Sequence, residues 1–210
     1  MTSTRRRDRT VAAFDFDGTL TRHDSLVPFL ARLVGWPRLL RALVGVAPAF
    51  AGALARRADR DDAKARLLVA LLRNEPYARV ADVGATYGRD LARTGLQPMM
   101  RDRVAWHRSQ GHDVVIVSAS LDLYLDTVGR LLDVQAVLCT RLEIDGSGRC
   151  TGRMLGGNCR GPAKATRLRD YLGAEPVEVW AYGDSAGDRE MFAMADHVVR
   201  ARRGRLTEGA

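Results

Sequence analysis

The chain has 210 residues, of which 46% are hydrophobic and 28% are charged, and its formal net charge is +8. This length suits one domain with an inserted subdomain or two small domains, and the composition is that of a folded globular protein. The basicity favours an anionic substrate or an anionic membrane surface. It does not favour nucleic acid, because aromatic residues are few and no nucleic-acid motif accompanies the arginines.

The cysteines and the N-terminal residues indicate the compartment. Three cysteines, an odd number that matches no zinc-binding spacing, favour a reducing environment. No apolar signal segment precedes the first predicted strand. We therefore expect a cytoplasmic protein. If the apolar segment described below contacts lipid, the protein would also lie at the inner face of the membrane.

The first predicted strand, residues 11–14, leads into two carboxylates, Asp15 and Asp17. A strand repeats every two residues, so both acids leave it on one side while Phe16 faces a core. Gly18 follows, where a backbone without Cβ can turn sharply or approach a ligand closely. Adjacent acids repel unless a cation neutralises them or one holds a proton, and both solutions suit phosphate chemistry with Mg²⁺. The alternative is a simple Asp-Gly turn.

Residues 26–93 are mostly helical in pattern and rich in Ala, Leu and Arg. Glycine, proline and charged clusters predict breaks near residues 35–37, 59–62 and 74–76. The sequence therefore predicts a block of several helices after the first strand.

One stretch of this block, residues 42–55, carries no charge. It is shorter than the about 20 residues that a membrane-spanning helix needs, and Pro48 is expected to interrupt a helix. The segment is interpreted either as a buried helical hairpin or as a surface that touches an anionic membrane. Trp36 and the flanking arginines keep the second interpretation open.

The second half of the chain alternates between strands and helices. The predicted strands are residues 114–118, 136–140, 177–182 and 195–200, the predicted helices are 121–132 and 162–172, and a hairpin turn lies at 145–148. This alternation predicts an α/β fold, a doubly wound, Rossmann-like parallel sheet with a helical cap inserted after the first strand. We expect a catalytic core of residues 1–25 and 94–210 and a cap of residues 26–93.

Polar side chains follow three of the predicted strands, and ligands bind at this edge of such sheets. Asp15 and Asp17 follow the first strand, Ser118 the second, and Asp184 a later one. Lys164 lies in the first turn of the helix that begins at Pro162. Taken singly, the serine could be a helix cap, the lysine a solvated side chain and residues 183–188 a turn.

In this order the motifs resemble the haloacid dehalogenase superfamily of phosphohydrolases, in particular its phosphoserine-phosphatase-like branch, subfamily IB. The resemblance rests on residues 15–20, on Ser118, on Lys164 with the preceding residues 158–161, and on residues 183–188. It covers essentially the whole chain, including the inserted cap. It implies a phosphoric monoester hydrolase that works with Mg²⁺ through an aspartyl-phosphate.

The resemblance also implies a role for each motif residue. Asp15 would be the nucleophile, and Asp17 would be the general acid towards the leaving alcohol and then the general base for water. The expected Mg²⁺ ligands are Asp15, the backbone carbonyl of Asp17, and Asp184, with Asp188 in support. The expected phosphate-binding residues are Gly18, Ser118, Ala119 and Lys164.

Departures from phosphoserine phosphatases leave the substrate open. Gly18 and Asp24 replace a Ser and a Glu, Ala119 replaces a Gly, and Asp24 would have a shorter reach to a substrate amine. A small soluble phosphomonoester, such as phosphoserine or a related amino-alcohol phosphate, is the first expectation. A phosphatidylglycerophosphate-type lipid phosphatase at the membrane surface is the alternative. A phosphotransferase and a non-catalytic lipid-binding relative are less favoured, and the oligomeric state is open.

Overall fold

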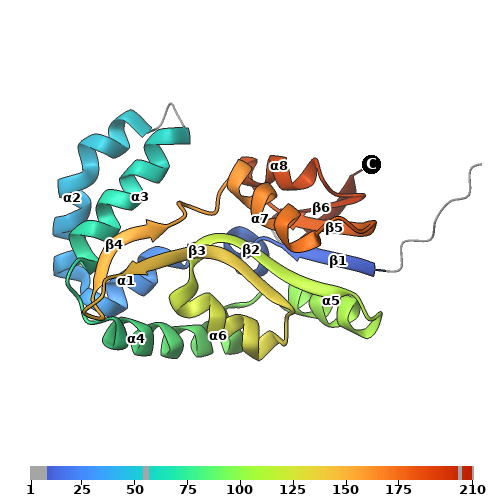
Figure 1. The fold of residues 1–210 in the computed structure, drawn as a ribbon, viewed down its shortest axis with the longest axis horizontal. Helices are drawn as coiled ribbons and strands as arrows, with labels where there is room; N and C mark the ends of the chain where they lie inside the picture. The colour runs from blue at the N-terminus through green and yellow to red at the C-terminus, as the bar shows by residue number, and fades with distance from the viewer. Residues whose placement is uncertain (1–8, 54–56, 203–204, 210) are drawn as a thin grey trace, which may run out of the picture.

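The computed structural model describes residues 9–53, 57–202 and 205–209, and a central β-sheet runs through them (Figure 1). The order of the strands in the sheet is β4-β3-β2-β1-β5-β6-β7. The five central strands are parallel, while β4 and β7 pair antiparallel at the two edges. The strands are β1 (Arg9–Phe14), β2 (Asp113–Leu121), β3 (Ala136–Ile144), β4 (Cys150–Leu155), β5 (Val177–Gly183), β6 (His197–Arg202) and β7 (Arg205–Gly209).

Helices cover both faces of this sheet, so the predicted doubly wound α/β fold is confirmed. Helices α5 and α6 lie on one face and α7 and α8 on the other (Figure 1). The α-helices are α1 (Leu26–Val34), α2 (Trp36–Ala53), α3 (Arg57–Leu72), α4 (Tyr77–Asp90), α5 (Pro98–Ser109), α6 (Asp122–Leu132), α7 (Pro162–Leu172) and α8 (Arg189–Phe192), with short turns at Phe16–Leu20, Leu91–Gly95 and Ala186–Asp188.

The period of two along each strand divides the core between these faces. Phe14 and Ile116 pack with α5 and α6, whereas Ala13, Val117 and Ala181 pack with α7 and α8. All five side chains are fully buried. Because both faces are apolar, the polar chemistry is left to the strand ends.

The helical insert after β1 follows the prediction and is held to the core by close helix contacts. On α4, a Cβ at Gly84 would lie 2.4 Å from the carbonyl oxygen of Leu123, and one at Gly88 would lie 2.5 Å from that of Tyr124. Glycine at both positions therefore lets α4 approach α6 closely. The division at residues 93 and 94 between cap and core stays a prediction.

Two predicted interruptions of the helical insert are wrong. Helix α2 continues through Pro48, which removes one backbone donor without ending the helix. Helix α3 also runs through residues 59–62. Aspartate has a low helix propensity, but Asp62 pairs with Arg66 one turn later, and packing of Leu67 and Leu71 in the core stabilises the helix. The connection between α2 and α3, residues 54–56, lies outside the described residues.

The C-terminal end of the sheet also differs from the prediction. The last parallel strand is shifted by two residues to His197–Arg202, and β7 adds an antiparallel strand that was not expected. Its pairing covers an edge of β6 that would otherwise expose unpaired backbone groups. The sequence of β7, Arg-Leu-Thr-Glu-Gly, lacks the apolar alternation that marks a strand.

Helix α2 has one buried and one exposed apolar face. Leu39 and Val46 belong to the core, while Trp36, Leu40 and Val44 are 58%, 54% and 73% exposed. Their spacing of four residues places the exposed three on one stripe. Among the described helices, none combines the length and the apolar character needed to cross a bilayer.

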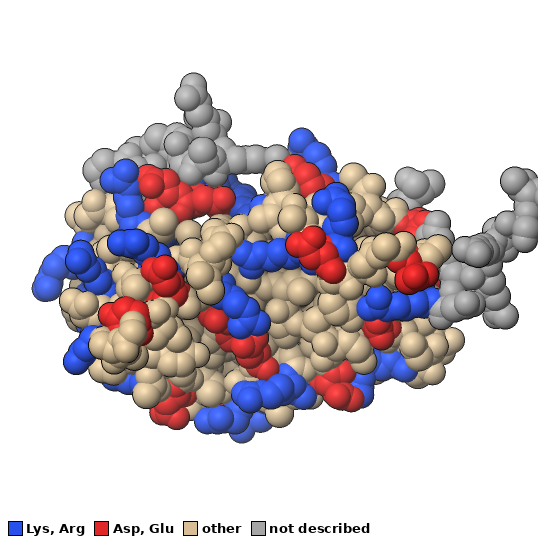
Figure 2. All heavy atoms as spheres, in the orientation of Figure 1, with Lys and Arg blue, Asp and Glu red and all other residues tan. Residues whose placement is uncertain are grey.

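The charged surface shows no concentrated patch on the face drawn in Figure 2. There the Lys and Arg side chains are interspersed with Asp and Glu side chains. On this face, therefore, no cluster of basic side chains marks a docking area for an anionic partner.

Candidate active site

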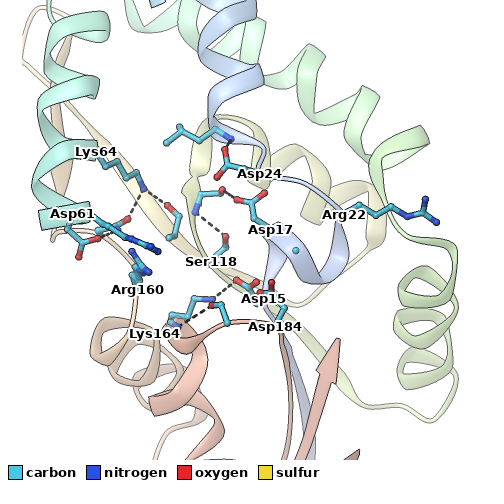
Figure 3. Close-up of a pocket in the computed structure, with 18 residues that line it drawn as sticks. Asp15, Asp17, Arg22, Asp24, Asp61, Lys64, Ser118, Arg160, Lys164 and Asp184 are labelled. Carbon is cyan, nitrogen blue, oxygen red and sulfur yellow. Dashed lines mark hydrogen bonds and ion pairs between the residues drawn. The ribbon is translucent and has the colours of Figure 1, made fainter. Parts of the chain in front are cut away.

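A pocket of about 420 Å³ lies where the carboxyl ends of β1, β2 and β5 meet the insert (Figure 3). The order of strands places β1 between β2 and β5, so the polar residues that follow these three strands gather at one edge. The pocket is lined by Asp15, Asp17, Gly18, Arg22, Asp24, Leu26, Arg60, Asp61, Lys64, Ser118, Ala119, Ser120, Asn158, Arg160, Lys164, Asp184, Ser185 and Gly187.

Asp15 is the first residue beyond β1 and is almost completely buried. Its backbone N–H still donates to the carbonyl of Tyr182, at 2.9 Å, so the sheet fixes its position. Its Oδ1 accepts from the ammonium of Lys164, and its Oδ2 accepts from the Thr19 hydroxyl at 3.1 Å. Burial raises the pKa of Asp15 to about 7, although the Lys164 ammonium opposes this shift.

Asp17 faces the same pocket but has different partners. Its Oδ1 accepts from the backbone N–H of Ser25 at 2.9 Å, and its Oδ2 accepts from the Ser120 hydroxyl. Burial raises the pKa of Asp17 to about 6, against the effect of these hydrogen bonds. A carboxyl group with this pKa can both give and take a proton near neutral pH.

Lys164 connects two carboxylates at the bottom of the pocket. Pro162 starts α7, and the first turn of that helix carries the buried Lys164. Its ammonium donates to Asp15 and, at 2.6 Å, to Oδ1 of Asp188. Burial alone would lower the pKa of Lys164, but the two carboxylates together raise it. The lysine is therefore a fixed positive charge beside Asp15.

A cluster of three carboxylates could hold a metal ion here. Oxygen atoms of Asp15, Asp184 and Asp188 all lie within 4.8 Å of one another. Three carboxylates against one ammonium leave an excess of negative charge, and carboxylate oxygens are the ligands that Mg²⁺ and Ca²⁺ prefer. The donor set therefore fits a hard divalent cation.

Gly18 makes room for this cluster. Its φ is +82°, a conformation that side-chain-bearing residues rarely adopt, and a Cβ there would lie 2.4 Å from Oδ2 of Asp184. Glycine is thus required both by the backbone turn and by the neighbouring carboxylate. The Ser that often occupies this position in phosphoserine phosphatases would not fit this arrangement without movement.

Ser118 and Ala119 lie on the wall of the pocket in the last part of β2, which ends at Leu121 and not at residue 118 as predicted. The hydroxyl oxygen of Ser118 accepts a hydrogen bond from the backbone N–H of Ser120 at 3.0 Å. A hydroxyl that accepts in this way keeps its own hydrogen for another acceptor.

The insert supplies the opposite wall of the pocket. Arg60, Asp61 and Lys64 come from α3, and Figure 3 shows Asp61 and Lys64 on the side of the pocket away from Asp15. Asp24 also lines the pocket, but its Oδ1 accepts from the first backbone N–H groups of α1, those of Leu26 and Val27, at 3.0 and 3.1 Å. Asp24 is therefore already engaged in stabilising the start of a helix.

The structure brings all the predicted site residues together. Asp15, Asp17, Gly18, Asp24, Ser118, Ala119, Lys164 and Asp184 all line the pocket, and the fully buried Asp188 lies behind it against Lys164. Sequence reasoning missed Ser120, Lys64, Asp61 and Arg60, which all line the pocket. Two of these carried a signal: Ser120 lies one strand period after Ser118, and Lys64 is one of two lysines in the chain.

Comparisons with known proteins agree with this geometry. A family model described as haloacid dehalogenase-like hydrolase matches residues 12–193. Protein CicA of Caulobacter vibrioides is 36% identical over 189 residues, which cover 89% of this chain and 83% of CicA. A probable phosphatase of Mycobacterium tuberculosis is 29% identical, over 97% of this chain and 73% of that protein.

A solved structure is similar in fold as well. The phospho-aspartyl intermediate analogue of phosphoserine phosphatase superposes with a TM-score of 0.65 at 20% identity, covering 91% of this chain and 86% of that one. The family model covers residues 12–193, and therefore the strands and helices that form the pocket. The chain belongs to the haloacid dehalogenase-like hydrolases and is a phosphatase-type enzyme with the fold of the phosphoserine-phosphatase-like branch.

Proposed function

We propose that the protein hydrolyses small soluble phosphomonoesters with Mg²⁺, through a phosphorylated Asp15. The observation that supports this most is the pairing of Asp15 with Lys164 beside Asp184 and Asp188. A nucleophile, a fixed positive charge and a cation site within one small pocket are what phosphoryl transfer needs.

Each step of the proposed reaction has a residue in place. A carboxylate oxygen of Asp15 forms a bond to phosphorus while the bond from phosphorus to the leaving oxygen breaks. Asp17 gives its proton to that oxygen. It then takes a proton from a water whose oxygen bonds to phosphorus while the bond from phosphorus to Asp15 breaks, which releases phosphate and restores the Asp15 carboxylate. Lys164 and Ser118 hold phosphoryl oxygens, and the Gly18 and Ala119 backbone groups are proposed to do the same.

The carboxylates of Asp15 and Asp184, with the carbonyl of Asp17 and with Asp188 in support, are proposed to hold Mg²⁺. When bound, the ion neutralises negative charge on the phosphoryl oxygens and on the acids around them. In its presence we expect Asp15 to be ionised at neutral pH in spite of its raised pKa.

The lining of the pocket favours a small, polar leaving group. Among its lining residues, Leu26 and Ala119 are the ones with apolar side chains, while Arg60, Asp61 and Lys64 face the space that a leaving alcohol would occupy. Such a lining suits phosphoserine or a related amino-alcohol phosphate. Asp24 is proposed to face the substrate amine, with one oxygen still bound to the start of α1.

One observation favours a lipid phosphate as the second candidate. The stripe of Trp36, Leu40 and Val44 on α2 of the insert is exposed and could contact a membrane surface. A phosphatidylglycerophosphate-type substrate would then reach the pocket from lipid. The charged lining of the pocket makes this the weaker proposal.

The test is Mg²⁺-dependent phosphate release from a panel of esters, with Asp15→Asn as the control. The panel holds phosphoserine, phosphoethanolamine, glycerol phosphate and phosphatidylglycerophosphate in mixed micelles. A preference for the soluble amino-alcohol phosphates supports the proposal, and a preference for the micellar lipid supports the second candidate. Transfer to an added alcohol instead of water would indicate a phosphotransferase. No release from any ester would contradict both.

A further inference from the structure

The side chain of Lys64 crosses from the insert to the core and ends at a backbone carbonyl. Its ammonium donates to the carbonyl oxygen of Ala119 at 2.5 Å and to Oδ1 of Asn158 at 2.7 Å. Lysine has three N–H donors, so two of them are used within the protein. Figure 3 shows Lys64 directed from α3 towards the strand ends.

The carbonyl that Lys64 holds belongs to the same peptide unit as the N–H that binds Ser118. In a planar trans peptide, the carbonyl of Ala119 and the N–H of Ser120 point in opposite directions. The carbonyl accepts from Lys64, and the N–H donates to the Ser118 hydroxyl oxygen at 3.0 Å. Fixing one end of this unit therefore fixes the other, and a charged donor on the carbonyl strengthens the opposite N–H as a donor.

Further hydrogen bonds hold the groups around the contact between Lys64 and Ala119 in place. Asn158 donates to Asp61, one turn before Lys64 on α3, at 2.7 Å. The Thr140 hydroxyl lies 2.8 Å from both the Ala119 carbonyl and Oδ1 of Asn158. Segments from α3, β2, β3 and the loop before α7 thus meet at one point.

We propose that Lys64 is a positioning residue, which holds the Ala119–Ser120 peptide unit so that the Ser118 hydroxyl hydrogen faces the phosphoryl group. The inference rests on the proposed function, because it assumes that Ser118 binds a phosphoryl oxygen. It adds that a charge on the insert controls the strength of that binding.

The ionisation of Lys64 is expected to follow its surroundings. Burial lowers the pKa of Lys64 to about 8, although Asp61, Asp17 and Asp24 act in the opposite direction. Cys159 acts in the same direction as these acids, and Arg60 and Arg160 line the same pocket. Phosphate binding should therefore weaken as the pH rises past about 8, since a neutral amine is a weaker donor.

A double-mutant cycle on inorganic phosphate tests the proposal, because phosphate binding needs no turnover. The dissociation constant is measured by calorimetry with Mg²⁺ for wild type, Lys64→Met, Ser118→Ala and the double variant. We expect Lys64→Met to weaken binding about 10- to 100-fold in the wild-type background, the range for a lost hydrogen bond to a charged group. In the Ser118→Ala background the same change should have little further effect.

Two variants of the same helix serve as controls. Arg66→Met removes an exposed charge that pairs with Asp62, and it should leave phosphate binding unchanged. Lys64→Arg keeps the charge and should bind more tightly than Lys64→Met, without the weakening above pH 8. If Lys64→Met does not fold, the pH dependence of phosphate binding by Lys64→Arg, compared with that of wild type, still tests the inference.

Equal effects of Lys64→Met in both backgrounds, or the same pH profile in wild type and Lys64→Arg, would overturn the inference. Failure of the proposed function would look different. In that case no ester would release phosphate. The double-mutant cycle would still report whether Lys64 and Ser118 are coupled in phosphate binding.

Discussion

The core wall and the insert wall of the pocket differ in how firmly their charges are held. On the core wall Asp15, Asp188 and Lys164 are nearly or fully buried and fixed to one another. On the opposite side Arg60 of α3 and Asp24, which precedes α1, are exposed to solvent, while Lys64 is held by Ala119 and Asn158. A preorganised set of charges suits a transition state that is the same for every phosphate ester, whereas a solvated wall can change with the leaving group. We therefore propose that the core wall carries the chemistry and that the exposed charges opposite it select the leaving group, while Lys64 supports phosphate binding from the insert.

The largest effect should come from the core wall, by Asp15→Asn. Removing the proposed nucleophile should lower kcat by about 10⁴-fold or more, as loss of a nucleophile does in other enzymes that form covalent intermediates. The amide keeps the size of the side chain, so the fold should survive. Phosphate release and circular dichroism check both points, and residual activity above a few per cent of wild type would remove Asp15 as the nucleophile.

Next in size is Asp17→Asn, which removes proton transfer but not the nucleophile. We expect a loss of about 10²- to 10⁴-fold for alkyl phosphates. An aryl ester needs less help in leaving, so para-nitrophenyl phosphate should still give a burst of nitrophenolate and then a slow steady state. Rapid-mixing absorbance measures the burst. An equal loss for both ester types in the first turnover would argue against a general-acid role.

Gly18→Ala should damage the metal site more than the fold. The new Cβ would lie 2.4 Å from Oδ2 of Asp184 and would sit on a backbone with φ of +82°. Gly111→Ala is a matched control, because its φ is +74° with nothing within 4 Å of the added Cβ. Both should lose about 1 kcal/mol or more of stability to backbone strain.

The two glycine variants should differ in the Mg²⁺ concentration that they need for activity. Gly18→Ala should require a much higher Mg²⁺ concentration for half-maximal activity, whereas Gly111→Ala should titrate like wild type. Identical Mg²⁺ titrations for the two would show that Asp184 is not a ligand.

The smallest expected effect is a pH dependence of stability in the metal-free protein. An acid whose pKa is raised by folding binds protons more tightly when folded, so stability is gained as the pH falls through the folded pKa, here about 7 for Asp15. Asp15→Asn removes this pH-dependent contribution to stability, because an amide does not titrate. The free energy of unfolding of the variant minus that of wild type should therefore be about 1 kcal/mol larger at pH 8 than at pH 6. Denaturant unfolding at both pH values in a chelator measures this, and a pH-independent difference would contradict it.

The sequence predicted the core wall better than the insert wall, and the reason is physical. Asp15, Asp17 and Asp184 follow strands and Ser118 lies in the last part of one, and the carboxyl ends of parallel strands lie at one edge of the sheet. Lys164 could be assigned through the family resemblance, since a lone lysine in a first turn carries no signal of its own.

The insert wall depends on contacts that no local pattern records. Lys64 and Asp61 meet Asn158, 94 and 97 residues further along the chain, through the packing of α3 onto the core. Asp24 was expected at a substrate amine, but it also holds the start of α1, a role that its position two residues before Leu26 could have indicated.

The central claim is that Asp15 carries the phosphoryl group during turnover, and acid quenching tests it most directly. The enzyme is mixed with Mg²⁺ and a reactive phosphate ester, quenched in acid within milliseconds, and digested for mass spectrometry. We predict one phosphoryl group on the peptide that contains Asp15, labile to hydroxylamine as an acyl phosphate, and none in Asp15→Asn. A phosphoryl group on another residue, or turnover in wild type without any labelled peptide, would contradict the account.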